Sequence, residues 1–206
     1  MPEAQAGVAS ILANDVVEED RLRAGLYRLI AGLLTAPPSS DMLRAAAALT
    51  GDETPLGLAI ARLARAADAA TAEVEGEAYH NLFVGLGRGI LVPFGSYYLT
   101  GFLHEKPLAK LRQTMAAHGI AREEGVGEPE DHVASLLEMM AGLIDGSFGS
   151  ALDPKGQKLF YGEHIGSWMP YFFRDLAGNE ESELYAALGA MGSAFLEIEE
   201  RAFRMV

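Results

Sequence analysis

The chain has 206 residues, of which 50% are hydrophobic and 22% are charged, so it can bury a core of its own as a globular protein. It contains no cysteine, which excludes disulfides, thiolate catalysis and cysteine-ligated metal centres. The net charge of −13 disfavours binding to nucleic acids and anionic membranes and favours a basic partner, although acidity alone also serves solubility.

Alanine and leucine are abundant and β-branched residues are few, which favours helix over sheet. Apolar residues repeat at helical spacing over about residues 16–34, and two prolines then end that helix. Further helices are predicted over residues 39–49, 55–70, 73–84, 107–118, from 129 onward, from 154 onward, and over 180–204. Pro55, Pro129 and Pro154 are each expected at the first helical position. The predicted fold class is all-α, a single helical bundle.

The polar, glycine-containing segment 119–127 is a hinge candidate. We therefore expect one all-helical domain over residues 1–206, with a larger N-terminal part at 1–118 and a smaller C-terminal part at 128–206. The first basic residue, Arg21, follows three acidic residues, which is the reverse of the order in an export signal. The chain also lacks a run of about 18 apolar residues. Both features predict a cytoplasmic location.

Enzyme motifs are weak in this sequence. Residues 85–89 read Gly-x-Gly-x-Gly, but they lack the Lys-Ser/Thr ending of a phosphate-binding loop and follow a predicted helix rather than a strand. Ser96 lacks the context of a hydrolase nucleophile. Glu128 and His132 lie four residues apart and should share a helix face, but no His-Glu-x-x-His motif accompanies them. The sequence therefore predicts no enzyme, no metal site and no cofactor.

Charge is distributed unevenly along the chain. Eight acidic residues and no lysine or arginine lie between Glu123 and Pro154, and five of the eight lie between Glu123 and Asp131. An apolar, glycine-rich connection at 85–95 and two aromatic clusters accompany this acidic segment. An acidic patch beside apolar side chains suits a peptide that carries arginines and leucines, because the guanidinium fork pairs with carboxylates. Core packing is the alternative role for the aromatic residues.

Three stretches resemble the TorD/DmsD/NarJ family of chaperones for molybdenum-containing oxidoreductases. The first joins residues 77–85 (EAYHNLFVG) and 93–98 (PFGSYY), which are similar to the family's Tyr-x-x-Leu-Phe-x-Gly and Pro-aromatic-x-Ser-x-Tyr segments. The second, residues 128–132 (EPEDH), matches the family's Glu-Pro-x-Asp-His signature. The third is His164-Ile-x-x-Trp168. Phe94 stands where the family commonly has tryptophan or tyrosine, a change that could alter the selectivity of a groove.

The resemblance implies an all-helical bundle and a cytoplasmic chaperone that binds the twin-arginine signal peptide or the apo catalytic subunit of a molybdoenzyme until the cofactor is inserted. It allows a monomer or a domain-swapped dimer. Glu128, Asp131 and His132 are the expected polar part of a peptide site, with Pro129 fixing the helix start. The expected apolar wall consists of Leu82, Phe83, Phe94, Ser96 and Tyr97. The expected supporting residues are Gly85, Pro93, Tyr98, His164 and Trp168.

Two other functions compete with this hypothesis. A helical adaptor or regulatory protein would bind a folded partner surface and ignore a signal peptide. An enzyme with an unrecognised helical active site would show turnover or a bound cofactor, and no candidate residues support it.

Overall fold

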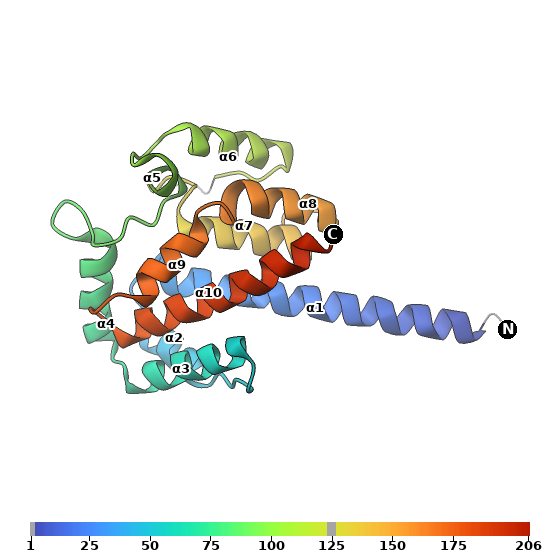
Figure 1. The fold of residues 1–206 in the computed structure, drawn as a ribbon, viewed down its shortest axis with the longest axis horizontal. Helices are drawn as coiled ribbons and strands as arrows, with labels where there is room; N and C mark the ends of the chain where they lie inside the picture. Colours follow the sequence, from blue (N-terminus) through green and yellow to red (C-terminus); the bar gives the residue numbers. More distant parts are fainter. Residues whose placement is uncertain (1–2, 123–126) are drawn as a thin grey trace.

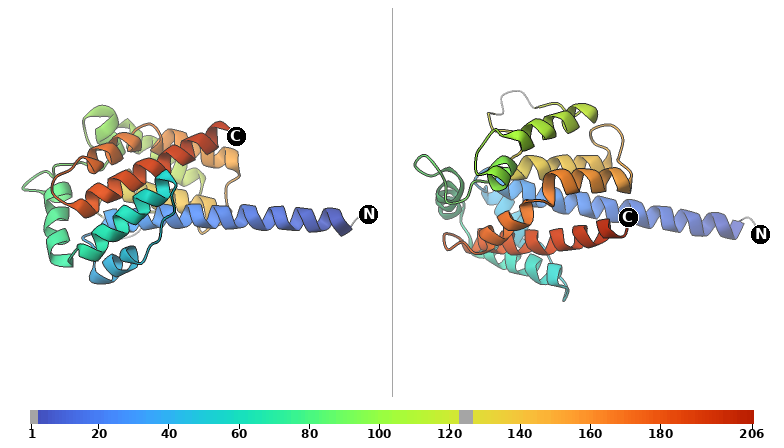
Figure 2. Two further views of the ribbon diagram at one scale, coloured as in Figure 1. Left: turned by 60° about the horizontal axis from the view of Figure 1, so that its bottom comes forward. Right: turned by 45° about the horizontal axis from the view of Figure 1, so that its top comes forward.

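The computed structural model describes residues 3–122 and 127–206, with side chains from Glu18 onward. Within these residues the chain is helical, and its β-type pairing is limited to an isolated antiparallel bridge between Phe94 and His132. The predicted all-α class is therefore confirmed. Figures 1 and 2 show one bundle of helices, beyond which the N-terminal part of the first helix extends.

The bundle is built around two long helices. In chain order its elements are α1 (Glu3–Thr35), α2 (Ser40–Ala47), α3 (Pro55–Ala69), α4 (Ala72–Tyr79), α5 (Gly95–Thr100), α6 (Lys106–Ala117), α7 (Val133–Asp145), α8 (Pro154–Phe160), α9 (Met169–Ala177) and α10 (Glu183–Arg204). The π-helical turns η1 (His80–Val84) and η2 (Tyr161–Ile165) extend α4 and α8. Helix α1 packs along α7, and α10 packs against both α3 and α9. One core therefore draws side chains from both halves of the chain.

Side-chain caps explain where several helices begin. Ser39, Thr54, Thr71, Asp153 and Ser182 each accept a hydrogen bond from a backbone N–H in the first turn of the helix that follows. Two of these helices, α3 and α8, also carry the predicted proline at their start. Among the described residues, no helix is both long and apolar enough to cross a bilayer.

Two predicted helix starts are wrong. Helix α1 begins at Glu3 instead of near residue 16, because the intervening segment is rich in alanine and contains no proline. Helix α7 begins at Val133 instead of Pro129. Residues 129–132 form a turn, closed by the His132 N–H donating to the Pro129 carbonyl at 3.2 Å. Pro129 therefore does not open a helix, and Glu128 does not share a helix face with His132.

Two short helices were not predicted from the sequence. Helix α5 lies at the end of the segment expected to be irregular, and α9 was not separated from the helix before it. A break between η2 and α9 means that His164 and Trp168 do not lie on one continuous helix. They are joined instead by the Trp168 Nε1–H, which donates to the His164 carbonyl at 2.8 Å.

The hinge expected at 119–127 includes residues 123–126, which lie outside the described residues. The division of the chain into parts at 1–118 and 128–206 therefore stays a prediction.

Helices α9 and α10 approach each other closely through glycine. A Cβ atom built on Gly189 would lie 2.3 Å from the Ala177 backbone nitrogen, and one built on Gly192 would lie 2.3 Å from the Phe173 ring. Both distances are far below van der Waals contact. The packing of α10 on α9 therefore requires glycine, which has no side chain, at both positions.

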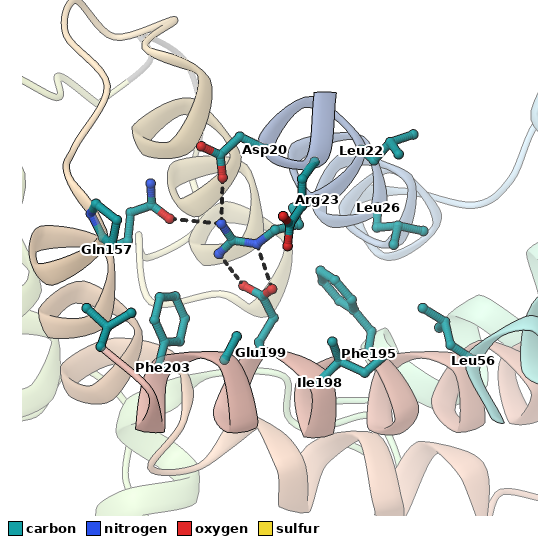
Figure 3. Close-up of a pocket in the computed structure, with 14 residues that line it drawn as sticks. Asp20, Leu22, Arg23, Leu26, Leu56, Gln157, Phe195, Ile198, Glu199 and Phe203 are labelled. Atoms are coloured by element: carbon teal, nitrogen blue, oxygen red, sulfur yellow. Dashed lines mark hydrogen bonds and ion pairs between the residues drawn. The ribbon is translucent and has the colours of Figure 1, made fainter. Parts of the chain in front are cut away.

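A partly buried ion pair joins α1 to α10 (Figure 3). The Arg23 guanidinium donates to both carboxylate oxygens of Glu199 at 2.8 Å, and also to Asp20 at 2.7 Å and Gln157 at 3.1 Å. Tyr27 donates its hydroxyl to Glu199 at 2.9 Å. The Glu199 side chain is only 1% exposed, so this carboxylate relies on its protein partners in place of water. The network borders a mainly apolar pocket of about 330 Å³.

Candidate functional site

Residues 93–98 of the first family-like stretch and the Glu-Pro-x-Asp-His segment lie side by side in the structure. The Gly95 N–H donates to the Asp131 carbonyl at 2.9 Å, and the Val133 N–H donates to the Pro93 carbonyl at 2.8 Å. The Phe94 and His132 rings meet edge to face with centroids 5.0 Å apart. Segments that are more than 30 residues apart in sequence are thus fixed against each other by backbone bonds and ring packing.

The third stretch packs against the place where residues 93–95 meet residues 131–133, which we call the junction. The Trp168 ring lies 5.4 Å from the Tyr98 ring, and a Cβ on Gly95 would lie 3.1 Å from Trp168 Nε1. His164 Nε2 lies 2.9 Å from Thr114 Oγ1 on α6. All three family-like stretches therefore converge on one region, and glycine at position 95 lets the indole come close.

Asp131 caps α5 from a distant part of the chain. Its Oδ2 accepts a hydrogen bond from the Ser96 N–H at 2.7 Å, whereas Phe94, the residue that precedes α5, provides no side-chain cap. Both Asp131 and Ser96 are buried, and Asp131 Oδ1 and Ser96 Oγ have no hydrogen-bond partner among the described residues. The Asp131 carboxylate therefore holds the start of α5 in place, as an N-cap supplied by another segment.

Replacing Asp131 by alanine should lower the free energy of unfolding by about 1–2 kcal/mol, because it removes this cap and leaves the Ser96 N–H buried without a partner. Asp131→Asn keeps a carbonyl acceptor and should lose less. Urea unfolding followed by circular dichroism measures both. If Asp131→Ala is as stable as the wild type but binds its partner less well, Asp131 contacts the partner directly and the capping role is wrong.

His132 is the N-cap residue of α7. Its Nδ1 accepts a hydrogen bond from the Ala134 N–H at 3.2 Å, so the neutral ring carries its proton on Nε2. Burial lowers the pKa of His132 to about 4, which keeps the ring uncharged at neutral pH. In this state His132 can accept through Nδ1 to hold the helix and donate through Nε2.

The His132 pKa has a consequence for stability. Because the folded state binds the His132 proton only near pH 4 and the unfolded chain binds it near pH 6.5, stability is fully present above pH 6.5 and falls as the pH drops toward 4. We expect a loss of about 2 kcal/mol between pH 7.5 and pH 5, measured by urea unfolding. His132→Asn, which keeps an acceptor for the Ala134 N–H, should show a smaller loss. An equal loss in both proteins would show that other groups cause it.

A pocket with carboxylates at its edge and apolar side chains in its floor lies beside this junction. It has a volume of about 360 Å³ and lies among the end of α6, the turn before α7, α7 itself and the end of α1. Its lining residues are Thr35, Met115, Ile120, Ala121, Arg122, Glu128, Glu130, His132, Ala134, Ser135, Glu138, Met139 and Phe148. We call it the acidic pocket. Three carboxylates stand at its edge, and methionine, isoleucine and phenylalanine side chains supply apolar surface.

The three carboxylates of the acidic pocket are not equivalent. Glu130 receives the Arg112 guanidinium at 2.9–3.3 Å; burial alone would raise its pKa, but this ion pair holds the pKa below its ordinary value. Glu138 lies 3.8 Å from Arg28, which binds Asp145 more closely at 2.6 Å. The exposed Glu128 side chain is in no ion pair within the described residues, and the Arg122 guanidinium donates to the Glu128 backbone carbonyl at 3.2 Å. Glu128 and Glu138 are therefore the carboxylates best placed to receive a cation from outside.

The Glu128 carboxylate also acts electrostatically on Tyr79, the last residue of α4. The pKa of Tyr79 is raised to about 12, mainly by burial and to a smaller extent by the negative charge of Glu128. The Tyr79 hydroxyl donates to the Thr35 carbonyl at 3.2 Å, at the end of α1. Tyr79 thus joins the end of α4 to the end of α1, whose last residue, Thr35, lines the acidic pocket.

The structure places only part of the predicted site on this pocket. Glu128 and His132 line it, and Asp131 lies behind it. None of the five residues of the predicted apolar wall lines the acidic pocket. Leu82 and Ser96 are buried, Phe83 packs on Tyr79 and Tyr185, and Tyr97 contacts Arg88. Their role in contacting a peptide stays a prediction.

The supporting residues hold the scaffold. Gly85 ends η1 with a positive φ of 60°, Pro93 accepts from Val133, and Tyr98, His164 and Trp168 form the packing described above. The apolar floor of Met115, Ile120, Met139 and Phe148 was missed in the sequence analysis. Its only signal was the methionine pair on the helix that follows the Glu-Pro-x-Asp-His segment, since flexible thioethers suit adaptable binding surfaces. Among the described residues, His, Asp and Glu form no cluster of three that could hold a metal ion.

Comparison with known proteins supports the resemblance. Residues 50–174, well over half of the chain, match the family described as nitrate reductase delta subunit. The chain is 31% identical over 124 residues to chaperone protein TorD of Vibrio cholerae, covering 57% of this chain and 56% of that protein. It is 31% identical over 117 residues to the probable Tat proofreading chaperone DmsD of Haemophilus influenzae, covering 56% and 55%. The chain thus spans little more than half the length of these relatives.

A solved structure shares the fold. The crystal structure of a proposed redox enzyme maturation protein from Archaeoglobus fulgidus superposes with a TM-score of 0.55 at 21% identity, covering 85% of this chain and 93% of that one. At this identity the likeness establishes the fold alone, and it confirms the predicted type of helical bundle.

Proposed function

Because the chain belongs to the nitrate reductase delta subunit family, whose relatives TorD and DmsD are named chaperones, we propose that it is a chaperone for the immature catalytic subunit of a molybdenum-containing oxidoreductase. It acts by binding and not by catalysis. Its client is held before cofactor insertion and export or assembly, which implies a cytoplasmic location.

The observation that carries the proposal is the acidic pocket. A twin-arginine signal peptide combines adjacent guanidinium groups with an apolar stretch. Glu128 and Glu138 can each receive a guanidinium, and Met115, Ile120 and Met139 offer apolar surface next to them. A guanidinium pairs with a carboxylate through two parallel hydrogen bonds, which a lysine ammonium cannot reproduce. The pocket therefore favours arginine over lysine.

Calorimetric titration with a twin-arginine signal peptide tests this proposal. Replacing both arginines by lysines should weaken binding, and so should raising the salt from 50 to 500 mM, because partly exposed charges are screened. Glu128→Gln/Glu138→Gln should weaken binding by about tenfold or more, since each lost charge-assisted hydrogen bond is worth about 1.5–3 kcal/mol before solvent screening.

The matched control is Glu53→Gln/Glu73→Gln, which removes the same charge from exposed positions that do not line the acidic pocket. It should bind the peptide like the wild type. If the two double variants lose equal affinity, the effect is one of net charge and not of the acidic pocket. If the wild type binds no signal peptide, recognition of a folded partner surface, the adaptor function, becomes the better account.

A further inference from the structure

Phe148 is an aromatic side chain at the acidic pocket, close to one of its carboxylates. It belongs to the loop 146–153 between α7 and α8, lines the acidic pocket and is 44% exposed. Its ring lies against α7 at Gly142, because a Cβ built on Gly142 would lie 2.1 Å from Phe148 Cε2 and 2.4 Å from Cδ2. The absence of a side chain at position 142 therefore leaves the space that the ring fills.

The backbone of the loop keeps Phe148 at this place. Gly146 ends α7 with a φ of 78°. Gly149 follows with a φ of 130°, and its N–H donates to the Gly146 carbonyl at 2.9 Å. The loop then returns to α7, where the Leu152 N–H donates to a carbonyl of that helix at 2.8 Å. Two glycines in conformations that other residues rarely adopt thus make the tight turn that brings Phe148 back onto α7.

Arg28 of α1 holds the start of the same loop. Its guanidinium lies 2.6 Å from the Asp145 carboxylate and donates to Ser147 Oγ at 3.0 Å. It lies 3.8 Å from the Glu138 carboxylate, which is near the limit for an ion pair. Burial raises the pKa of Glu138, and Arg28 only partly opposes this effect. A second cation would therefore stabilise the charged form of Glu138.

Glu138 and Phe148 lie within reach of one guanidinium. Glu138 and Gly142 are four residues apart on α7, and side chains at this spacing start about 5–6 Å from each other. The Phe148 ring, which lies at Gly142, is therefore about one helical turn from Glu138. Among the described residues, none of the three guanidiniums that pack on aromatic rings packs on Phe148. The exposed part of the ring is thus open to a cation from outside.

A planar guanidinium can lie flat on an aromatic ring and still donate N–H groups from its edge to a carboxylate. A lysine ammonium is a compact, strongly hydrated charge that does not stack in this way. We propose that the acidic pocket contains an arginine subsite, in which one guanidinium of the client lies on the Phe148 ring and donates to Glu138. This inference rests on the proposed function and identifies Phe148 as the residue that selects arginine over lysine.

The ratio of two affinities tests the arginine subsite. Calorimetry with the twin-arginine signal peptide and with its Lys-Lys version gives the preference of the protein for arginine. Phe148→Leu keeps an apolar side chain in the pocket and should lower this preference about three- to fivefold, because a cation–π contact is lost. Phe148→Tyr should keep the preference. Tyr171→Leu removes an exposed ring that does not line the acidic pocket and should also leave the preference unchanged.

Gly142→Ala gives an independent test, because it keeps Phe148 in the chain but places a methyl group where the ring lies. Alanine is a better helix former than glycine, so α7 should persist, and circular dichroism checks this. Gly142→Ala should lower the preference for arginine as much as Phe148→Leu does. Because both changes act on one ring, Gly142→Ala/Phe148→Leu should lower it no further than either single change.

The arginine subsite is overturned if Phe148→Leu keeps the wild-type preference or if Tyr171→Leu lowers it equally. Weaker binding by Glu128→Gln/Glu138→Gln would still support the proposed function in either case. NMR of the Phe148 ring during titration with N-acetyl-arginine amide separates the two proposals further. If the wild type binds no signal peptide but the arginine amide shifts the ring resonances more than N-acetyl-lysine amide does, the subsite stands and the signal peptide is the wrong ligand. Absence of both effects overturns both proposals.

Discussion

Replacing Glu199 by alanine is expected to lower the free energy of unfolding by about 3 kcal/mol or more, which is the usual cost of breaking a buried ion pair by removing one partner. The change leaves the Arg23 guanidinium, with its side chain only 18% exposed, without its bidentate carboxylate. It also leaves the Tyr27 hydroxyl buried without its acceptor. Asp20 and Gln157 still contact Arg23, so the loss should stay below complete unfolding.

Two variants show whether the buried pair is the cause. Glu197→Ala, half a turn away on the same helix, removes an exposed carboxylate whose partner is Arg201, and should change stability by less than about 0.5 kcal/mol. Arg23→Met/Glu199→Met removes both charges and should recover much of the loss seen in Glu199→Ala. If Glu199→Ala and Glu197→Ala have the same small effect, the network does not hold α1 to α10.

Replacing Gly189 by alanine should destabilise the protein by about 2 kcal/mol or more, although alanine is the better helix former by about 1 kcal/mol. The new methyl group would lie 2.3 Å from the Ala177 nitrogen and 2.7 Å from its Cα, which are backbone atoms that cannot turn away. Helices α9 and α10 would have to separate. Thermal unfolding followed by circular dichroism measures the shift in Tm.

Gly25 on α1 offers the matched control. It also lies inside a helix, but no atom lies within 4 Å of a Cβ built there. Gly25→Ala should therefore raise the free energy of unfolding by about 0.5–1 kcal/mol. Changes of opposite sign in the free energy of unfolding for Gly189→Ala and Gly25→Ala would support close packing of α10 on α9. A stabilising Gly189→Ala would contradict it.

The long helices could be predicted from the sequence because each carries a local signal. Thr54 with Pro55, and Asp153 with Pro154, place a capping side chain and a proline at a helix start, and both starts were predicted correctly. The same reasoning failed at Pro129. There the chain makes a turn, and the cap of α7 is His132, whose extended backbone is fixed by pairing with Phe94. That pairing is a tertiary contact, which a local pattern does not reveal.

The site was harder to predict for the same reason. The motifs identified the residues that meet at the junction, but not which of them face outward. The sequence predicts that the Asp131 carboxylate binds a peptide. In the structure this side chain is buried and caps the start of α5. Glu138 lies on the helix predicted to follow the Glu-Pro-x-Asp-His segment but was not predicted as a site residue, and in the structure it lines the acidic pocket. Exposure depends on long-range packing and does not follow from spacing alone.

Hydrogen exchange with and without a twin-arginine signal peptide tests the central claim most directly, because it reports where the peptide binds. Bound peptide should slow amide exchange at the end of α6, in residues 120–122 and along the first two turns of α7, which line the acidic pocket. Exchange in the loop at 84–90 should be unaffected. Slowed exchange in residues 84–103 with none in α7, or no change anywhere, would contradict the acidic pocket as the site of the signal peptide.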